Sequence, residues 1–175
     1  MRKNTQSYAV LIPLAGIIIS LDQWTKSLVR TNLAYGEFWS PWDWLEPFAR
    51  VVHWYNTGVA LGLFQDKNLL FTILVAIIAL VIFIFYPRLT EGDWFLMIAL
   101  GMQFGGSIGN LIDRISLGHV TDFISVGRFP VFNIADASIT VGVGIMILGV
   151  WLQERKEKQK ALNKPNQEQE KSETG

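Results

Sequence analysis

The 175-residue sequence contains no cysteine and carries little charge. The lack of cysteine excludes disulfides, thiolate metal ligands and a cysteine nucleophile, and it leaves the redox compartment open. Charged residues make up only 17% of the chain and their net charge is zero, so composition does not indicate binding to nucleic acid or to an acidic partner. Half of the residues are hydrophobic and the mean hydropathy is +0.29, which predicts a membrane protein.

Four apolar stretches are candidates for membrane-spanning helices, at about 8–28, 68–86, 94–112 and 134–151. The second has nineteen residues without a charge, which is long enough to cross a bilayer. The first resembles a secretory signal peptide, but no small-x-small cleavage site follows it, so we interpret it as an uncleaved span. The sequence therefore predicts an all-α membrane protein with four transmembrane helices and a small β-like, aromatic portion outside the membrane.

The chain is long enough for one helical bundle, which we assign to residues 1–152 as a single domain. Residues 153–175 form a charged, low-complexity tail that we expect to be disordered. Lysine and arginine flank the spans at the N-terminus, in the 87–93 loop and at 155–158, but are sparse in the long 29–67 connection. The positive-inside rule then places both termini, including the tail, in the cytoplasm.

An amide and a carboxylate recur at the same spacing on the third and fourth predicted spans. Asn110 and Asp113 are three residues apart, as are Asn133 and Asp136, so each helix presents both groups on one face. With both termini inside, these residues share the outer side with Asp122. Two carboxylates in a partly desolvated place share one proton, so one acts as a base and the other as an acid. This favours hydrolysis of a peptide bond by an activated water.

Three aspartates are candidates for the acid–base pair. Asp113 is followed by Arg114, and an Asp-Arg pair at a helix end is often structural. Asp122 lacks an adjacent cation and lies in a short β-like run, in which Thr121 and Asp122 face opposite sides. We favour Asp122 with Asp136. The alternative for each aspartate is helix capping or solvation at the interface, and Asp136 also suits the positive N-terminal end of its helix.

Other functions remain open at this point. His53 and His119 offer too few ligands for a catalytic metal. Ser107 and Ser138 lack a base, because neither histidine lies in a predicted span and no lysine lies inside the second to fourth spans. A small proton-linked transporter needs buried acids as well, but it requires polar groups through the depth of the bundle, and the second and fourth spans are apolar in their inner halves. A non-catalytic subunit leaves the repeated Asn/Asp spacing unexplained.

Five blocks, spread over about residues 8–152, together resemble the lipoprotein signal peptidases, the signal peptidase II family of bacterial aspartic membrane proteases. The blocks are Asp22-Gln-Trp-Thr-Lys26, Asn56-Thr-Gly-Val-Ala60, Gly105-Gly-Ser-Ile-Gly-Asn-Leu-Ile-Asp-Arg114, Val120-Thr-Asp122 and Phe132-Asn-Ile-Ala-Asp136. The resemblance implies that Asp122 and Asp136 are the catalytic dyad. It implies substrate contacts from Asn56, Asn110, Arg114 and Asn133, and structural support from Asp22, Lys26 and Asp113.

The resemblance also implies a bacterial cytoplasmic-membrane enzyme with its active site on the extracytoplasmic side. Its substrates are prolipoproteins whose cysteine carries diacylglycerol, and cleavage precedes that cysteine without a metal or other cofactor. We expect membrane lipid as a further partner, no nucleic acid, and a monomer. The second block departs from the family pattern, because Val59 replaces alanine and Leu61 replaces an aromatic residue, which predicts an altered pocket wall rather than altered chemistry.

The 29–67 connection is rich in aromatic residues, which favour the membrane–water interface. We consider two roles for this segment, a platform that covers the dyad when substrate binds and a plain interfacial anchor. The residues concerned are Trp39, Trp42, Trp44, Phe48 and Trp54.

Overall fold

The computed structural model describes residues 2–57, 68–91 and 93–173, with side chains between residues 7 and 159 of these ranges. The elements follow in the order α1 (Arg2–Asn32), β1 (Phe38–Trp39), β2 (Ala49–Asn56), α2 (Asn68–Thr90), α3 (Trp94–Leu117), β3 (Val120–Val126) and α4 (Ile134–Glu173). Within these ranges, four helical segments are long and apolar enough to cross a membrane: Ser7–Asn32, Asn68–Thr90, Trp94–Leu117 and Ile134–Gln159. The predicted four-span fold is confirmed.

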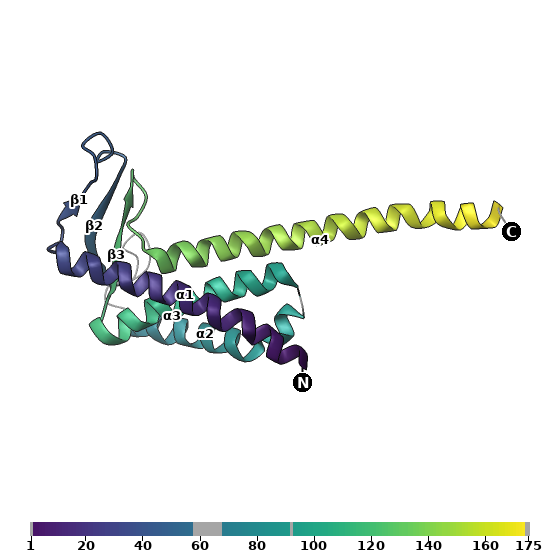
Figure 1. Ribbon diagram of the computed structural model, residues 1–175, viewed down its shortest axis with the longest axis horizontal. Helices are drawn as coiled ribbons and strands as arrows, with labels where there is room; N and C mark the ends of the chain where they lie inside the picture. Colours follow the sequence, from purple (N-terminus) through teal and green to yellow (C-terminus); the bar gives the residue numbers. More distant parts are fainter. Residues whose placement is uncertain (1, 58–67, 92, 174–175) are drawn as a thin grey trace.

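Helix α3 lies at the centre of the bundle and contacts α1, α2 and α4 (Figure 1). Its glycines allow this close approach, as expected for small residues between membrane helices. A Cβ atom on Gly105 would lie 3.0 Å from the Ala15 Cα of α1, and one on Gly106 would collide with the Ala135 carbonyl of α4. Both junctions therefore depend on glycine.

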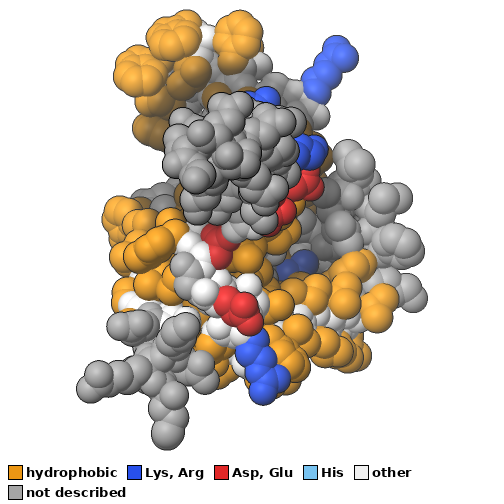
Figure 2. All heavy atoms as spheres, turned by 90° about the vertical axis from the view of Figure 1, so that its right-hand side faces the viewer, with side chains coloured by type: hydrophobic (Ala, Val, Ile, Leu, Met, Phe, Trp, Pro, Cys, Tyr) orange, Lys and Arg blue, Asp and Glu red, His pale blue; other side chains and the backbone are white. Residues whose placement is uncertain are grey.

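The core away from the sheet is apolar. Leu11, Ile82, Tyr86 and Met97 form a buried cluster that joins α1, α2 and α3. The outer surface of the helices is also hydrophobic, with Leu69 72% and Ile147 62% exposed, as expected for side chains that face lipid. Figure 2, seen from the end at which α4 projects, shows hydrophobic side chains over much of the described part of this face.

Two helix ends differ from the expected limits. We expected Pro87 to end the second span, but α2 continues to Thr90. Proline lacks the N–H that would bond the Phe83 carbonyl, and the Tyr8 hydroxyl donates to that carbonyl instead, at 2.8 Å. Helix α3 runs five residues past Ile112 and ends where Gly118 adopts a left-handed conformation, with φ of 79°.

Helix α4 continues through Glu173, and the disorder expected for residues 153–175 stays a prediction. The segment is rich in Glu, Lys and Gln, which have high helix propensity, and it contains one proline, Pro165. The boundary of the domain at residue 152 stays a prediction.

A three-stranded antiparallel sheet covers the end of the bundle opposite the N-terminus (Figure 1). The strand order is β1-β2-β3; Phe38 pairs with Val52, and Asn56 pairs with Val120. After β3 the chain turns and Phe132 bridges back to Ile124, immediately before α4. The β-like run at Val120 is thus confirmed, and it belongs to a larger sheet formed with the aromatic connection.

Candidate active site

Asp122 and Asp136 meet at the junction of the sheet and the bundle, and Asn133 joins them. The Asn133 side-chain amide donates to Asp122 Oδ1 at 2.7 Å. Its side-chain oxygen accepts the Asp136 N–H at 2.9 Å, and its backbone N–H donates to Asp136 Oδ2 at 3.3 Å. A single asparagine therefore contacts both carboxyl groups.

The contacts between Asn133 and Asp136 also form a capping box at the start of α4. Asn133 is the N-cap residue and Asp136 is the third residue of the helix, so each side chain satisfies the backbone N–H of the other. The capping role that we considered as an alternative for Asp136 is therefore present. The capping box uses Oδ2 of Asp136 and leaves Oδ1 outside it.

Two further asparagines each donate to one carboxyl group of the pair. Asn110, from α3, donates to Asp136 Oδ1 at 2.7 Å. Asn56, at the end of β2, donates to Asp122 Oδ2 at 2.9 Å. Four chain segments that are distant in sequence thus meet around the two aspartates, and the structure brings together three of the asparagines that the resemblance assigned to substrate contacts.

Asp122 lies in β3, outside the spanning segments, and its side chain is only 1% exposed. Burial and, second, the charge of Asp136 raise the pKa of the Asp122 carboxyl from 3.8 to about 7, although the amide donors Asn56 and Asn133 act in the opposite direction. A carboxyl group in this state carries a proton near neutral pH, as an acid catalyst requires.

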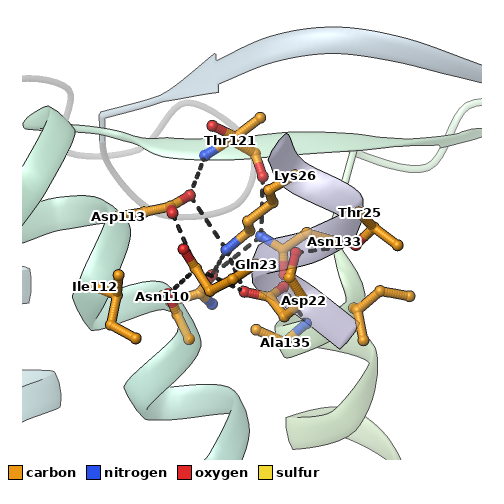
Figure 3. Close-up of polar contacts among 12 residues, drawn as sticks. Asp22, Gln23, Thr25, Lys26, Asn110, Ile112, Asp113, Thr121, Asn133 and Ala135 are labelled. Atoms are coloured by element: carbon orange, nitrogen blue, oxygen red, sulfur yellow. Dashed lines mark hydrogen bonds and ion pairs between the residues drawn. The ribbon is translucent and has the colours of Figure 1, made fainter. Parts of the chain in front are cut away.

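Asp113 lies in a different environment, among cations. Lys26 Nζ contacts Asp22 Oδ2 at 2.8 Å and Asp113 Oδ2 at 3.3 Å, and Arg30 lies 3.7 Å from Asp113 Oδ1. Asp113 also accepts the Thr121 N–H at 2.9 Å, which fixes β3 beside α3. Figure 3 shows Lys26 pointing from α1 into this group.

Asp22 ties α1 to α4, since its Oδ1 accepts the Ala135 N–H at 2.9 Å. Gln23 was not predicted to belong to the site. Its side-chain amide donates to Asp22, to the Gly109 carbonyl and to Asp113, at 3.2, 3.0 and 3.1 Å. The only hint in the sequence was the position of Gln23 directly after Asp22 in the first block. A glutamine near the end of an apolar span does not by itself indicate a site residue.

Arg114 is half-buried. The carboxylates whose charge acts on its guanidinium are those of Asp136, Asp122 and Asp113. The two histidines are engaged elsewhere. The buried His53 contacts the Leu33 carbonyl through Nδ1 at 2.8 Å. His119 packs on Tyr55, with the two ring centroids 4.0 Å apart. In the parts of the chain that the structure describes, no group of three or more His, Asp or Glu side chains is arranged to hold a metal ion.

The aromatic side chains of the 29–67 connection lie on the sheet and its loop, and they are exposed. The rings of Trp42 and Trp44 are stacked with their centroids 5.9 Å apart, and Trp44 and Phe48 are each 67% exposed. Both the covering and the anchoring role stay predictions. Val59 and Leu61, on which the altered pocket wall depends, lie outside the described residues.

The chain was compared with known proteins. The sequence profile of the family described as signal peptidase (SPase) II matches residues 14–152. A lipoprotein signal peptidase of Shouchella clausii is 42% identical over 149 residues, which are 83% of this chain and 95% of the relative. One of Dehalococcoides mccartyi is 42% identical over 135 residues, which are 74% and 82% of the two chains.

Among solved structures, a bacterial membrane enzyme determined by the in meso method matches with a TM-score of 0.77 and 30% identity, over 86% of this chain and 92% of that chain. A second structure with the same description matches with a TM-score of 0.73 and 31% identity, over 81% and 92%. The enzyme interpretation is thereby confirmed over the transporter and the non-catalytic subunit. The chain belongs to the signal peptidase II family and is a membrane endopeptidase of the aspartic type.

Proposed function

We propose that this enzyme removes signal peptides from prolipoproteins whose cysteine carries diacylglycerol, and that it cleaves on the N-terminal side of that cysteine. The observation that carries the proposal is the pair formed by Asp122 and Asp136, two carboxyl groups joined by Asn133. Family membership supports the substrate class, since the relatives are named lipoprotein signal peptidases.

In the proposed reaction, the two aspartates share one proton. Asp122 carries it at the start, because burial raises the pKa of this carboxyl to about 7. Ionised Asp136 takes a proton from a water, whose oxygen bonds to the scissile carbonyl carbon. Asp122 gives its proton to the departing nitrogen as the C–N bond breaks, so no covalent intermediate forms.

The amides around the dyad fit this chemistry. Asn56, Asn110 and Asn133 hold the carboxylate oxygens in fixed directions, which limits the reorganisation needed during the reaction. In the proposal the Arg114 guanidinium faces the substrate and stabilises the negative charge that develops on the carbonyl oxygen. The reaction needs no metal ion.

We further propose that both termini are cytoplasmic and that the site faces the extracytoplasmic side of the bacterial membrane. The even number of spans, the basic residues before the first span and after the last, and the location of the sheet opposite the N-terminus support this orientation (Figure 1). The exposed aromatic side chains then lie in the outer interface, close to the lipid-modified cysteine of a substrate.

The test is cleavage of matched peptides by the purified enzyme in detergent. One peptide carries a diacylglyceryl cysteine after its signal sequence, and its partner carries an unmodified cysteine. We expect cleavage of the first alone, immediately before the cysteine by mass spectrometry, and full activity in a metal chelator. Equal cleavage of both peptides, or activity lost in chelator and restored by zinc, contradicts the proposal.

The aromatic platform is tested separately with the double variant Trp42→Ala/Trp44→Ala. If the platform covers bound substrate, hydrolysis slows although the protein still inserts in the membrane. An unchanged rate leaves these residues as interfacial anchors only.

A further inference from the structure

Lys26 is fully buried, and its ammonium group has three partners. Two are the carboxylates of Asp22 and Asp113, at 2.8 and 3.3 Å. The third is the side-chain oxygen of Asn110, at 3.0 Å. The two carboxylates already balance Lys26 and its neighbour Arg30 in charge, so the bond to Asn110 is additional to what charge neutrality requires.

The bond from Lys26 fixes which way the Asn110 amide points. An ammonium group can only donate, so the atom of Asn110 that faces it must be the oxygen. The NH₂ group of Asn110 then faces Asp136 Oδ1, to which it donates at 2.7 Å. If the amide turned over, two donors would face each other at Lys26 and two acceptors at Asp136.

The same logic applies to Asn133 on the other side of the dyad. The Asp136 N–H can only donate, so it fixes the oxygen of Asn133 and leaves the NH₂ group to face Asp122. The Asn133 amide also donates to the Asn110 oxygen at 3.1 Å, which links the two amides. Lys26 and the two amides thus form one connected set of directed hydrogen bonds that ends on both carboxyl groups. Figure 3 shows Lys26, Asn110 and Asn133 side by side.

We propose that Lys26 is a positioning residue for catalysis. Its ammonium group aligns the Asn110 amide on Asp136, and its charge favours the ionised form of the dyad. Lys26 touches neither water nor substrate, since it is 0% exposed, and it acts only through Asn110 and through its field. This inference rests on the proposed roles of Asp122 and Asp136.

The charged surroundings of the dyad come from four elements. Asp22, Lys26 and Arg30 lie on α1, Asp113 and Arg114 on α3, Asp122 on β3 and Asp136 on α4. Among the described cations of this group, the Lys26 side chain is fully buried and the Arg30 side chain is 28% exposed. The charge of Lys26 lowers the pKa of Asp122, so it opposes the effects of burial and of Asp136.

The test replaces Lys26 in a background that keeps the buried charge balanced. Asp22→Asn serves as the common background, and Lys26→Met and Lys26→Gln are compared within it. Met removes both the donor and the charge, whereas Gln removes the charge but keeps a donor for Asn110. We expect kcat to fall about 100-fold with Met and about tenfold with Gln, with KM unchanged in both.

The pH profile separates positioning from a purely structural role. Loss of a nearby positive charge raises the pKa of Asp122, so the limb of the kcat profile that this carboxyl sets moves to higher pH, by roughly one unit. Met and Gln share this shift because both remove the charge. A lower rate with unmoved limbs means that Lys26 only supports the structure, and this result overturns the proposal.

Two single variants serve as controls. Lys26→Arg keeps the charge and a donor, so its limbs stay within a few tenths of a unit of the wild type even though its rate falls. Arg30→Gln removes a second cation of α1, one that contacts Asp113 but not Asn110. This change should shift the limbs of the pH profile less than Lys26→Met does. If the Met and Gln variants fail to fold, Lys26→Arg still decides, because limbs that move with the charge retained contradict the proposal.

Failure of this inference can be told apart from failure of the proposed function. If Asp122→Asn or Asp136→Asn retains wild-type turnover, the dyad itself is wrong. If both abolish turnover and the Lys26 variants leave rate and pH limbs unchanged, the dyad stands and only the role of Lys26 is refuted.

Discussion

The two ends of the bundle differ in the polarity of their buried side chains. Away from the sheet, the buried side chains are mainly apolar, as in the cluster of Leu11, Ile82 and Met97. Beneath the sheet, the most completely buried side chains are ionic or polar: Asp22, Lys26, Asp113, Thr121, Asp122 and Asn133. Apolar contacts tolerate small shifts, whereas a buried charge is costly unless each of its partners is in place. Stability is therefore expected to depend mainly on the first end and chemistry on the second.

The largest expected effect isolates chemistry at the polar end. Asp122→Asn and Asp136→Asn each keep the shape of the side chain but remove its ability to exchange a proton. We expect turnover of the lipid-modified peptide to fall by about 10³-fold or more. The melting temperature in detergent should fall much less, although the new amide group faces an N–H donor where a carboxylate oxygen accepted. A variant that unfolds as well would blur the contrast between the two ends, and wild-type turnover in either would refute the dyad.

The second prediction concerns the junction between α3 and α4, on which the polar end is built. A methyl group on Gly106 collides with the Ala135 carbonyl next to Asp136, so Gly106→Ala should lower stability by about 1–3 kcal/mol and reduce activity with it. Gly144→Ala is the matched control, because a Cβ there meets nothing within 4 Å. Thermal unfolding and turnover of both variants decide; equal behaviour contradicts the packing argument.

The third prediction is a limb in the pH profile. The pKa of Asp122 is raised to about 7, so this carboxyl is protonated below that pH and ionised above it. Loss of its proton leaves two carboxylates and no acid, so kcat/KM should fall about tenfold for each pH unit above roughly 7. The measurement is kcat/KM against pH in one detergent; a constant rate through this region would contradict the assignment of Asp122 as the acid.

The smallest expected effect belongs to the apolar end. Tyr8→Phe removes the hydroxyl that bonds the Phe83 carbonyl, which Pro87 leaves without a backbone donor. We expect a loss of about 1 kcal/mol in stability and an unchanged kcat. Pro87→Ala restores the N–H, so Tyr8→Phe should cost less in that background. A double-mutant cycle with no coupling would show that the two residues do not compensate for each other.

The same division explains what the sequence could predict. Spans were visible because apolar length is a local property. Asp136 could be proposed because an amide and a carboxylate repeat at helical spacing, and Asp122 was preferred to Asp113 because no cation adjoins it. Lys26 and Asp22 are one helical turn apart, which is also local. The contacts of Gln23 with Gly109 and Asp113 were not visible, because they depend on how α1 crosses α3.

Other differences have equally specific causes. The Val51–Tyr55 segment contains β-branched and aromatic residues typical of a strand, and this signal was available but was interpreted as an interfacial connection. The extension of α2 past Pro87 was not predictable, since it depends on a tyrosine from another helix. The orientation of Asn110 likewise depends on Lys26, which is distant in sequence.

The bridge between Ile124 and Phe132 closes the turn between β3, which contains Asp122, and α4, which contains Asp136. The Ile124 N–H and the Phe132 N–H each donate to the carbonyl of the other residue, at 2.8 and 3.1 Å, so the chain leaves and re-enters the site at one fixed point. The exposed turn beyond the bridge, around Gly127 and Phe129, is therefore decoupled from the distance between Asp122 and Asp136. It is a natural insertion point for an epitope or a fluorophore that reports on the enzyme while leaving its chemistry in place.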